Sequence, residues 1–185
     1  MAAPGKWIQG ISAKSRVTDA ARISLIARID AVQQLLPLAA LSYEEDVEHV
    51  HRLRVASRRA VATLDLYHDF LPSKRSHWMR KKLKKIRRAA GAARDLDVLS
   101  SRLSEVLTDE SSAVIKELAR RRLEAQPAIV AVYEKAMAKN RLRRRTAKIL
   151  KKIRPRRARD RKSQLSTMES WSERRLQQIA RRFFK

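Results

Sequence analysis

The sequence contains no cysteine, only three glycines and five prolines, and few aromatic residues, which make up 5% of the chain. Without cysteine there can be no disulfide bonds and no thiolate metal sites, and this usage fits a reducing compartment such as the cytoplasm. The scarcity of glycine and aromatic residues disfavours an all-β fold. The first fourteen residues hold no long apolar run, so no secretory signal is indicated. No stretch approaches the roughly 20 apolar residues that a membrane span needs.

Acidic residues are also scarce. The sequence has 19 of them and 44 lysines and arginines, which gives a net charge of +25. A surface this basic repels itself and needs a polyanion to neutralise it. Nucleic acid, inorganic polyphosphate and an anionic membrane surface are the candidates. The hydrophobic fraction of 44% is ample for a core, so the chain is not disordered as a whole. Its 185 residues fit one domain or two small ones.

The abundant residues are Leu, Ala, Arg, Lys and Glu, which favour helices, and no strand pattern is present. Apolar residues recur at helical spacing along five segments, so we expect an all-α, antiparallel bundle of long helices. The predicted helices run from near Ser15 to Pro37, from Tyr43 to Phe70, from Ser73 to Leu107, from Ser111 or Ser112 onward, and from Ser166 to Phe184. Residues 1–14 are expected to be a flexible N-terminus, and residues 15–185 a single helical domain.

Local signals refine these boundaries. Ser42 and Glu45 have the spacing of a capping box at the start of the second helix. Pro37 and Pro127 are expected to kink or end their helices, and Gly91 indicates close helix packing or a bend. Residues 141–162 are strongly basic. Within them, "TAKILKKI" is compatible with a helix, and residues 154–163 are interpreted as a solvated linker, because like charges repel and a proline interrupts them.

The stretch "HVHRLRVASRR" combines charge with an apolar stripe. On a helical wheel the stripe contains Val50, Leu53, Ser57, Ala60, Val61 and Leu64. His51, Arg54 and Arg58 lie in one row at its edge, and Arg52 and Arg59 lie further round. The edge of a stripe is where two helices meet, in a partly desolvated groove that attracts an anion more strongly than an open face does. Arginine suits such a groove because its planar guanidinium pairs with phosphate oxygens.

The third predicted helix is the other basic element. It carries ten basic residues and no acid between Lys74 and Arg94. Its candidate anion-binding residues are Lys74, Lys81, Lys82, Lys84, Lys85, Arg87 and Arg88. Arg94 falls on the apolar side of this helix with Asp97 three residues on. We interpret Arg94 and Asp97 as a structural ion pair that fixes helix contacts, and not as a catalytic dyad.

Catalysis has little support in the sequence. The four histidines, His49, His51, His68 and His77, lack the HExxH spacing of a zinc site, and there is no P-loop and no GxGxxG motif. The basic segments lack the clustered carboxylates that would hold a metal. We therefore predict no catalytic residue, no metal site and no cofactor.

Two motifs resemble the CHAD family, the conserved histidine α-helical domain. They are "VHRLRVASRR" (residues 50–59) and "GAARDLDV" (residues 91–98), and a lysine- and arginine-rich helix separates them. The resemblance implies an all-α fold of two antiparallel four-helix bundles related by a pseudo-twofold axis. It further implies a cavity or pore lined by basic residues that binds inorganic polyphosphate without catalysis. By position, His51, Arg54, Arg58 and Arg59 match the first motif.

Arg94, Asp95 and Asp97 match the second motif. The resemblance is good from roughly Ala20 to Leu107, within the motif-bearing half of the domain, residues 15–107. A full domain repeats a His/Arg motif in its second half, and no such run follows Leu107. We therefore expect the second half to be missing or shortened, and two chains to pair about a twofold axis in its place.

Three functions remain open at this point. The leading one is binding of inorganic polyphosphate, with a cytoplasmic location or an association with polyphosphate or storage granules. The second is binding of nucleic acid, which charge alone does not exclude, although the chain offers few aromatic side chains for stacking. The third is a granule-surface adaptor whose last helix, ending "IARRFFK", binds a membrane or polymer surface.

Overall fold

The structure is a computed structural model, and it describes residues 7–105, 113–154 and 167–183. Over these ranges the regular elements are all helical, apart from an isolated β-bridge between Arg16 and Thr167, which confirms the predicted fold class. The α-helices are α1 (Val17–Leu41), α2 (Glu48–Leu66), α3 (Ser73–Ala89), α4 (Gly91–Ser104), α5 (Ala113–Met137), α6 (Arg141–Leu150) and α8 (Met168–Phe183). The short 3₁₀ helices are η1 (His68–Phe70) and η2 (Ala138–Asn140).

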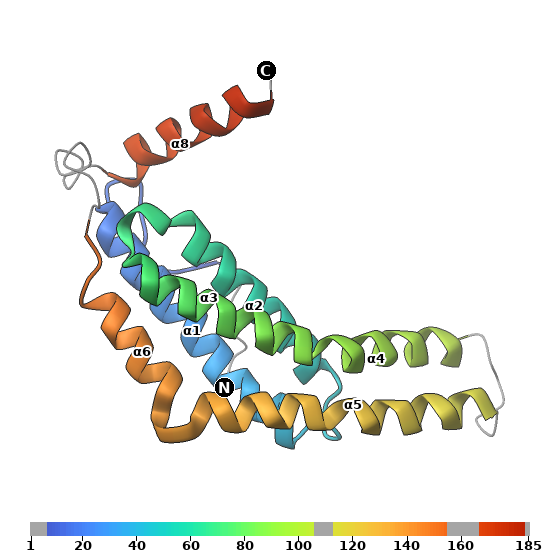
Figure 1. Ribbon diagram of the computed structural model, residues 1–185. Coiled ribbons are helices and arrows are strands. Elements are labelled where there is room, and N and C mark those ends of the chain that lie inside the picture. Colours follow the sequence, from blue (N-terminus) through green and yellow to red (C-terminus); the bar gives the residue numbers. More distant parts are fainter. Residues whose placement is uncertain (1–6, 106–112, 155–166, 184–185) are drawn as a thin grey trace.

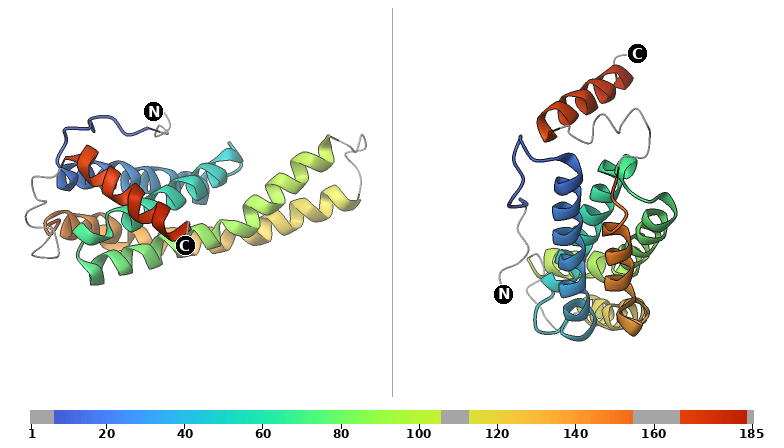
Figure 2. Two further views of the ribbon diagram at one scale, coloured as in Figure 1. Left: turned by 90° about the horizontal axis from the view of Figure 1, so that it is seen from above. Right: turned by 90° about the vertical axis from the view of Figure 1, so that its left-hand side faces the viewer.

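Helices α1, α2, α3 and α6 pack into a bundle with the second half of α5 (Figure 1). Helix α4 and the first half of α5 form an antiparallel hairpin, called the arm below, that extends beyond the other helices (Figure 2). The core lies between the bundle helices. Its largest fully buried side chains include Leu25, Ile29, Leu36, Leu53, Leu64, Met79, Leu83, Ile129, Leu142 and Ile149.

The predicted apolar stripe of α2 is confirmed. All six of its residues are buried, and Ser57 is the only polar one among them. The stripe faces α1 on one side and α3 on the other, and these are the neighbours that α2 contacts most. Burial of a Leu or Val side chain contributes roughly 1.5–3 kcal/mol, so this stripe fixes how α2 is rotated and where its charged residues point.

The predicted start of the second helix is wrong. Helix α2 begins at Glu48 and not near Tyr43, and the Ser42 side chain does not cap it. Because α1 continues to Leu41, the residues up to Val47 are needed to turn the chain. The Glu48 N–H instead donates to Asp46 Oδ1 at 2.8 Å.

The two helical prolines do not end their helices. Helix α1 passes through Pro37 and α5 passes through Pro127. Each proline forfeits one backbone hydrogen bond, but buried neighbours hold both sides of the helix in the core, namely Leu36 and Ala39 in α1 and Gln126 and Ile129 in α5.

The predicted third helix is two helices. It breaks at Ala90, where α3 ends and α4 begins at Gly91. A Cβ atom on Gly91 would lie 3.1 Å from Nη1 of Arg54. Glycine at this position therefore lets the Arg54 guanidinium of α2 approach the α3–α4 junction closely.

The expectation about membrane spans needs correction. By length and composition alone, α1 is long and apolar enough to cross a membrane, and half of the relevant stretch is buried. In the bundle these apolar residues build the core with α2, and the core helix of a soluble protein passes the same test.

The C-terminal elements agree with the sequence pattern. Helix α6 contains most of "TAKILKKI", and α8 has the predicted extent within two residues at its start. Trp171 of α8 stacks on Tyr67, with ring centroids 5.6 Å apart, and meets Phe70 edge-on at 6.2 Å. The predicted serine caps of the fourth helix, and nearly all of the predicted basic linker, lie outside the described residues.

Candidate polyanion-binding surface

Helices α2 and α3 lie side by side in antiparallel orientation. Two contacts fix their register. Arg80 of α3 pairs with Asp65 of α2 at 2.6 Å, and Arg54 of α2 reaches Gly91 at the far end of α3. The exposed Arg58 lies between these two contacts along α2. The two sequence motifs therefore touch each other in space.

A cleft of about 830 Å³ lies between α3 and α5. Its lining residues are His77, Arg80, Lys81, Lys84, Lys85, Arg88, Ala89, Ala128, Ala131, Val132 and Lys135. None of them is acidic. Four are predicted site residues, and sequence reasoning missed His77, Arg80 and Lys135 as cleft residues. Lys135 stands on α5 outside any motif, so only the packing of α5 against α3 reveals it.

A second, smaller groove of about 150 Å³ lies between α1 and α2. His51, Arg52 and Arg59 line it together with Arg28 of α1, which the sequence did not single out. Burial, and then the positive charge of Arg59, lower the pKa of the Arg28 guanidinium. The groove is therefore a place where positive charges are crowded together.

The predicted row of His51, Arg54 and Arg58 is thus divided. His51 opens into the groove toward α1, whereas Arg54 approaches the junction of α3 and α4. The cause is that α2 packs between two helices, so both edges of its stripe meet a neighbour. Two further predicted residues, the exposed Lys74 and the half-buried Arg87, lie on α3.

Lys82 belongs to a cluster that adjoins the cleft and shares Lys85 and Lys135 with it. It lies with Trp78, Arg141 and Lys135 at the junction of α3, α5 and α6. Burial, and then the charges of Arg141 and Lys85, lower the pKa of its ammonium group. Positive charges are therefore also crowded at the junction of α3, α5 and α6.

Some cations of the protein have a carboxylate neighbour and others do not. Arg52 pairs with Asp46 at 3.1 Å and Arg121 with Glu117 at 2.7 Å, and within the cleft Arg80 pairs with Asp65. Across the described residues, no carboxylate lies within ion-pair distance of four cleft residues, which are Lys81, Lys84, Lys85 and Arg88. Their charge is available to an external anion.

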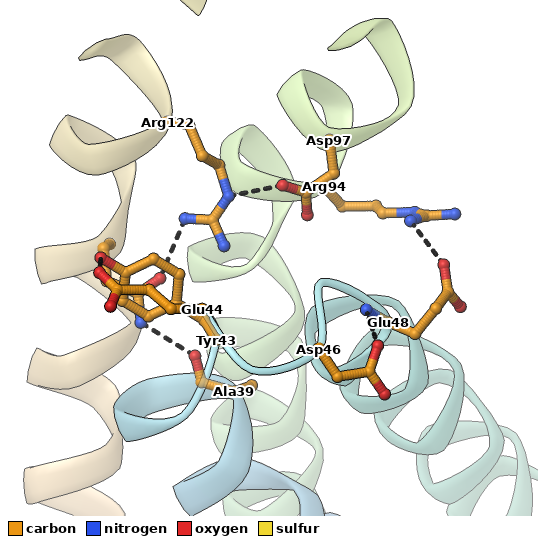
Figure 3. Close-up of polar contacts among 9 residues, drawn as sticks. Ala39, Tyr43, Glu44, Asp46, Glu48, Arg94, Asp97 and Arg122 are labelled. Carbon is orange, nitrogen blue, oxygen red and sulfur yellow. Dashed lines mark hydrogen bonds and ion pairs between the residues drawn. The ribbon is translucent and has the colours of Figure 1, made fainter. Parts of the chain in front are cut away.

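The predicted ion pair between Arg94 and Asp97 is wrong. Arg94 Nη1 donates to Glu48 Oε1 of α2 at 3.0 Å, and Asp97 Oδ1 accepts from Nε of Arg122 in α5 at 2.6 Å (Figure 3). Helical spacing places Arg94 and Asp97 on neighbouring turns, but it does not show that each has a different helix beside it. Both residues still act structurally, since each links α4 to another helix.

The contacts of Arg122 continue into a buried polar network. Its guanidinium lies over the Tyr43 ring, 4.8 Å from the centroid, and donates to Gln126 Oε1 at 3.1 Å. The Gln126 amide in turn donates to the carbonyls of Ala39 and Ala40 at the end of α1, at 2.9 and 2.8 Å. The second motif thereby joins α4 and α5 to the end of α1, which holds the arm on the bundle.

No metal centre is formed by the described residues, because no three His, Cys, Asp or Glu side chains among them are close enough to hold an ion.

Comparison with known proteins bears on this surface. Comparison with curated proteins gave no match, and neither did comparison with solved structures. The family model of the CHAD domain matches residues 24–185, which include both motif helices and continue over α5, α6 and α8. CHAD domains are generally non-catalytic binding domains. On this match, the chain belongs to the CHAD domain family.

Proposed function

We propose that the chain binds inorganic polyphosphate on the cationic surface formed by α2, α3 and α5. The observation that carries the proposal is the large cleft in which Lys81, Lys84, Lys85 and Arg88 have no carboxylate partner among the described residues. A linear polyanion fits an open cleft, because successive phosphates meet successive side chains along one face of α3. Membership of the CHAD family supports the same ligand.

Binding is proposed to be multidentate and without chemical change. Each lysine or arginine contributes a charge-assisted hydrogen bond to a phosphate oxygen, and counterions leave both partners. His51 in the α1–α2 groove adds a hydrogen-bond donor. We infer a binding protein and not an enzyme.

A charge-matched pair of variants tests the site. The first replaces Lys81, Lys84, Lys85 and Arg88 by alanine. The control replaces four exposed cations of the arm, which are Arg102, Lys116, Arg120 and Arg121. Both proteins lose four positive charges. We expect the cleft variant to lose most of its polyphosphate affinity while it keeps its helical circular dichroism, and the arm variant to bind nearly as the parent does. Equal losses in the two variants would assign binding to net charge alone.

Nucleic acid is the alternative ligand, since the cations that meet polyphosphate also meet a nucleic-acid backbone. Labelled long-chain polyphosphate should be competed with double-stranded DNA, RNA and heparin at about 150 mM salt. We expect unlabelled polyphosphate to be the strongest competitor when all competitors are compared at equal concentration of anionic groups. A stronger effect of DNA or RNA would replace polyphosphate as the proposed ligand.

Self-association is proposed as well. In α4 only Ala93 is buried, and Leu99 is 45% exposed. Leu123, on α5, is also exposed. Two arms packed about a twofold axis in a four-helix arrangement would cover exposed apolar residues of this kind. Light scattering should give twice the chain mass, and Leu99→Glu should return the protein to a monomer. A parent protein that is monomeric at micromolar concentration would refute the dimer.

The cellular location follows from the proposed ligand. We propose a cytoplasmic protein that collects on polyphosphate or storage granules, either as a binder of the polymer or as a granule-surface adaptor. A fluorescent fusion should mark granules in cells that accumulate polyphosphate and spread evenly when the cleft variant replaces the parent. A fusion that marks membranes instead would favour a role for α8 as a surface anchor.

A further inference from the structure

One aromatic side chain lies within the cationic surface. Trp78 of α3 is half-buried, and three cationic groups lie near its ring. Nζ of Lys82 is 5.6 Å from the ring centroid, Cζ of Arg141 is 5.7 Å away, and Cζ of Arg145 is 5.0 Å away. These distances allow cation–π attraction, so the indole holds guanidinium groups of α6 close to α3.

A pocket adjoins this ring. The buried Ile86, Val132 and Leu142 line it together with Lys85 and Lys135. Lys85, Val132 and Lys135 also line the large cleft, so the pocket and the cleft are continuous. The pocket itself is small, about 30 Å³. That volume suits water and not a ring, so a ligand ring would lie on the surface over Trp78 and Arg145.

This surface differs from what a bare phosphate chain requires. A phosphate chain would engage the cations and leave the exposed part of the Trp78 indole against water. A nucleobase at the end of such a chain would cover it, because bases stack on tryptophan rings and on arginine guanidinium planes. We propose that the junction of α3, α5 and α6 is a binding site for nucleoside polyphosphates. The base stacks on Trp78 and Arg145, and the phosphates lie toward Lys85 and Lys135. This inference rests on the proposed binding of phosphate chains in the cleft.

The test compares two ligands that carry three linked phosphates and differ in the nucleoside. ATP and tripolyphosphate are titrated calorimetrically into the full chain in magnesium-free buffer. Stacking of one base contributes about 1–3 kcal/mol, so ATP should bind at least about fivefold more tightly. Equal affinities, or tighter binding of tripolyphosphate, would overturn the inference.

Two substitutions assign the preference to Trp78. Trp78→Leu keeps an apolar side chain without a ring, and ATP should then bind no better than tripolyphosphate. Trp78→Phe keeps a ring and should retain most of the preference. The readout is the ratio of the two affinities in each protein, because loss of the ring also releases the α6 guanidinium groups that it holds. Circular dichroism should show the parent's helix content in both variants. An ATP preference that persists in Trp78→Leu would refute the role of the indole.

The outcomes also separate this inference from the proposed function. If long-chain polyphosphate and tripolyphosphate bind the parent but ATP has no advantage, only the nucleotide site is refuted. If none of the three ligands binds, the polyphosphate function fails and the nucleotide site fails with it.

Discussion

At the scale of single residues, the ion pair between Asp97 and Arg122 is a buried charge contact of the arm. The Asp97 side chain is 4% exposed and that of Arg122 is 13% exposed. Loss of one partner of a buried pair leaves the other charge without compensation, which typically destabilises a protein by about 3–5 kcal/mol.

We predict that Asp97→Ala lowers the free energy of unfolding by about 3 kcal/mol, because the Arg122 guanidinium would remain buried without a counter-charge. Urea denaturation followed by circular dichroism measures the change. Asp95→Ala is the control, since Asp95 is exposed on the same helix, and it should change stability by less than about 0.5 kcal/mol. Similar losses in the two variants would contradict the importance of the pair.

Lys82 gives a prediction about pH. Its pKa lies below the usual 10.5 through burial and then through the charges of Arg141 and Lys85. An anion bound nearby favours the charged ammonium and raises that pKa again. Affinity should therefore fall as pH rises through the lowered pKa, and binding at alkaline pH should take up a proton. Calorimetry in two buffers of different ionisation enthalpy measures the uptake. The same uptake in Lys82→Met would show that another group is responsible.

The sequence predicted the roles of single residues better than it predicted which residues pair with each other. The pattern identified Arg94 and Asp97 as structural, but it paired them with each other, whereas their partners are Glu48 and Arg122. A helical wheel orders residues around one axis and contains no information about which helix lies beside each position. Contacts such as that of Arg54 with Gly91 therefore required the fold.

At the scale of elements, α5 is a continuous helix in spite of Pro127, and Pro127 is exposed. Alanine there would restore the N–H that bonds to the carbonyl four residues back and remove a steric clash with it. We predict that Pro127→Ala stabilises the protein by about 1–3 kcal/mol, as seen in its urea midpoint at unchanged m-value. A loss of stability would show that the proline shape is needed for the packing of α5.

Helix existence and type followed from periodicity, and helix ends did not. The apolar stripe of α2 was correct at every position. Its start was not, because Ser42 has capping chemistry but lies on the turn after α1. The prolines misled for a related reason, since tertiary burial on both sides of Pro37 outweighs its local preference.

At the scale of the whole molecule, the net charge of +25 governs how binding responds to salt. Released counterions make the logarithm of affinity fall linearly with the logarithm of salt concentration. We predict that the four-residue cleft variant lowers this slope by up to about four, near one for each phosphate that the variant no longer neutralises. Fluorescence titrations at several salt concentrations measure it. The arm variant should keep the parent slope, and a matching decrease there would argue against a localised site.

The candidate site was predictable in composition and not in shape. The basic residues of α2 and α3 were identified, and three of those on α2, His51, Arg54 and Arg58, were predicted to lie in one row. Packing distributes them between a cleft toward α5 and a groove toward α1, and it adds Arg28 and Lys135 from helices without a motif. Only the arrangement of neighbouring helices contains this division.

The crowding of unpaired cations also has a consequence for the stability of the fold. Folding brings Lys81, Lys84, Lys85 and Arg88 together on one face, and their mutual repulsion opposes the folded state. A polyanion that binds only the folded chain removes this repulsion and adds its own binding free energy to that of folding. The melting temperature is therefore a property of the complex. It should rise with polyphosphate concentration, so the free protein and the protein on a granule would differ in their resistance to heat and proteolysis.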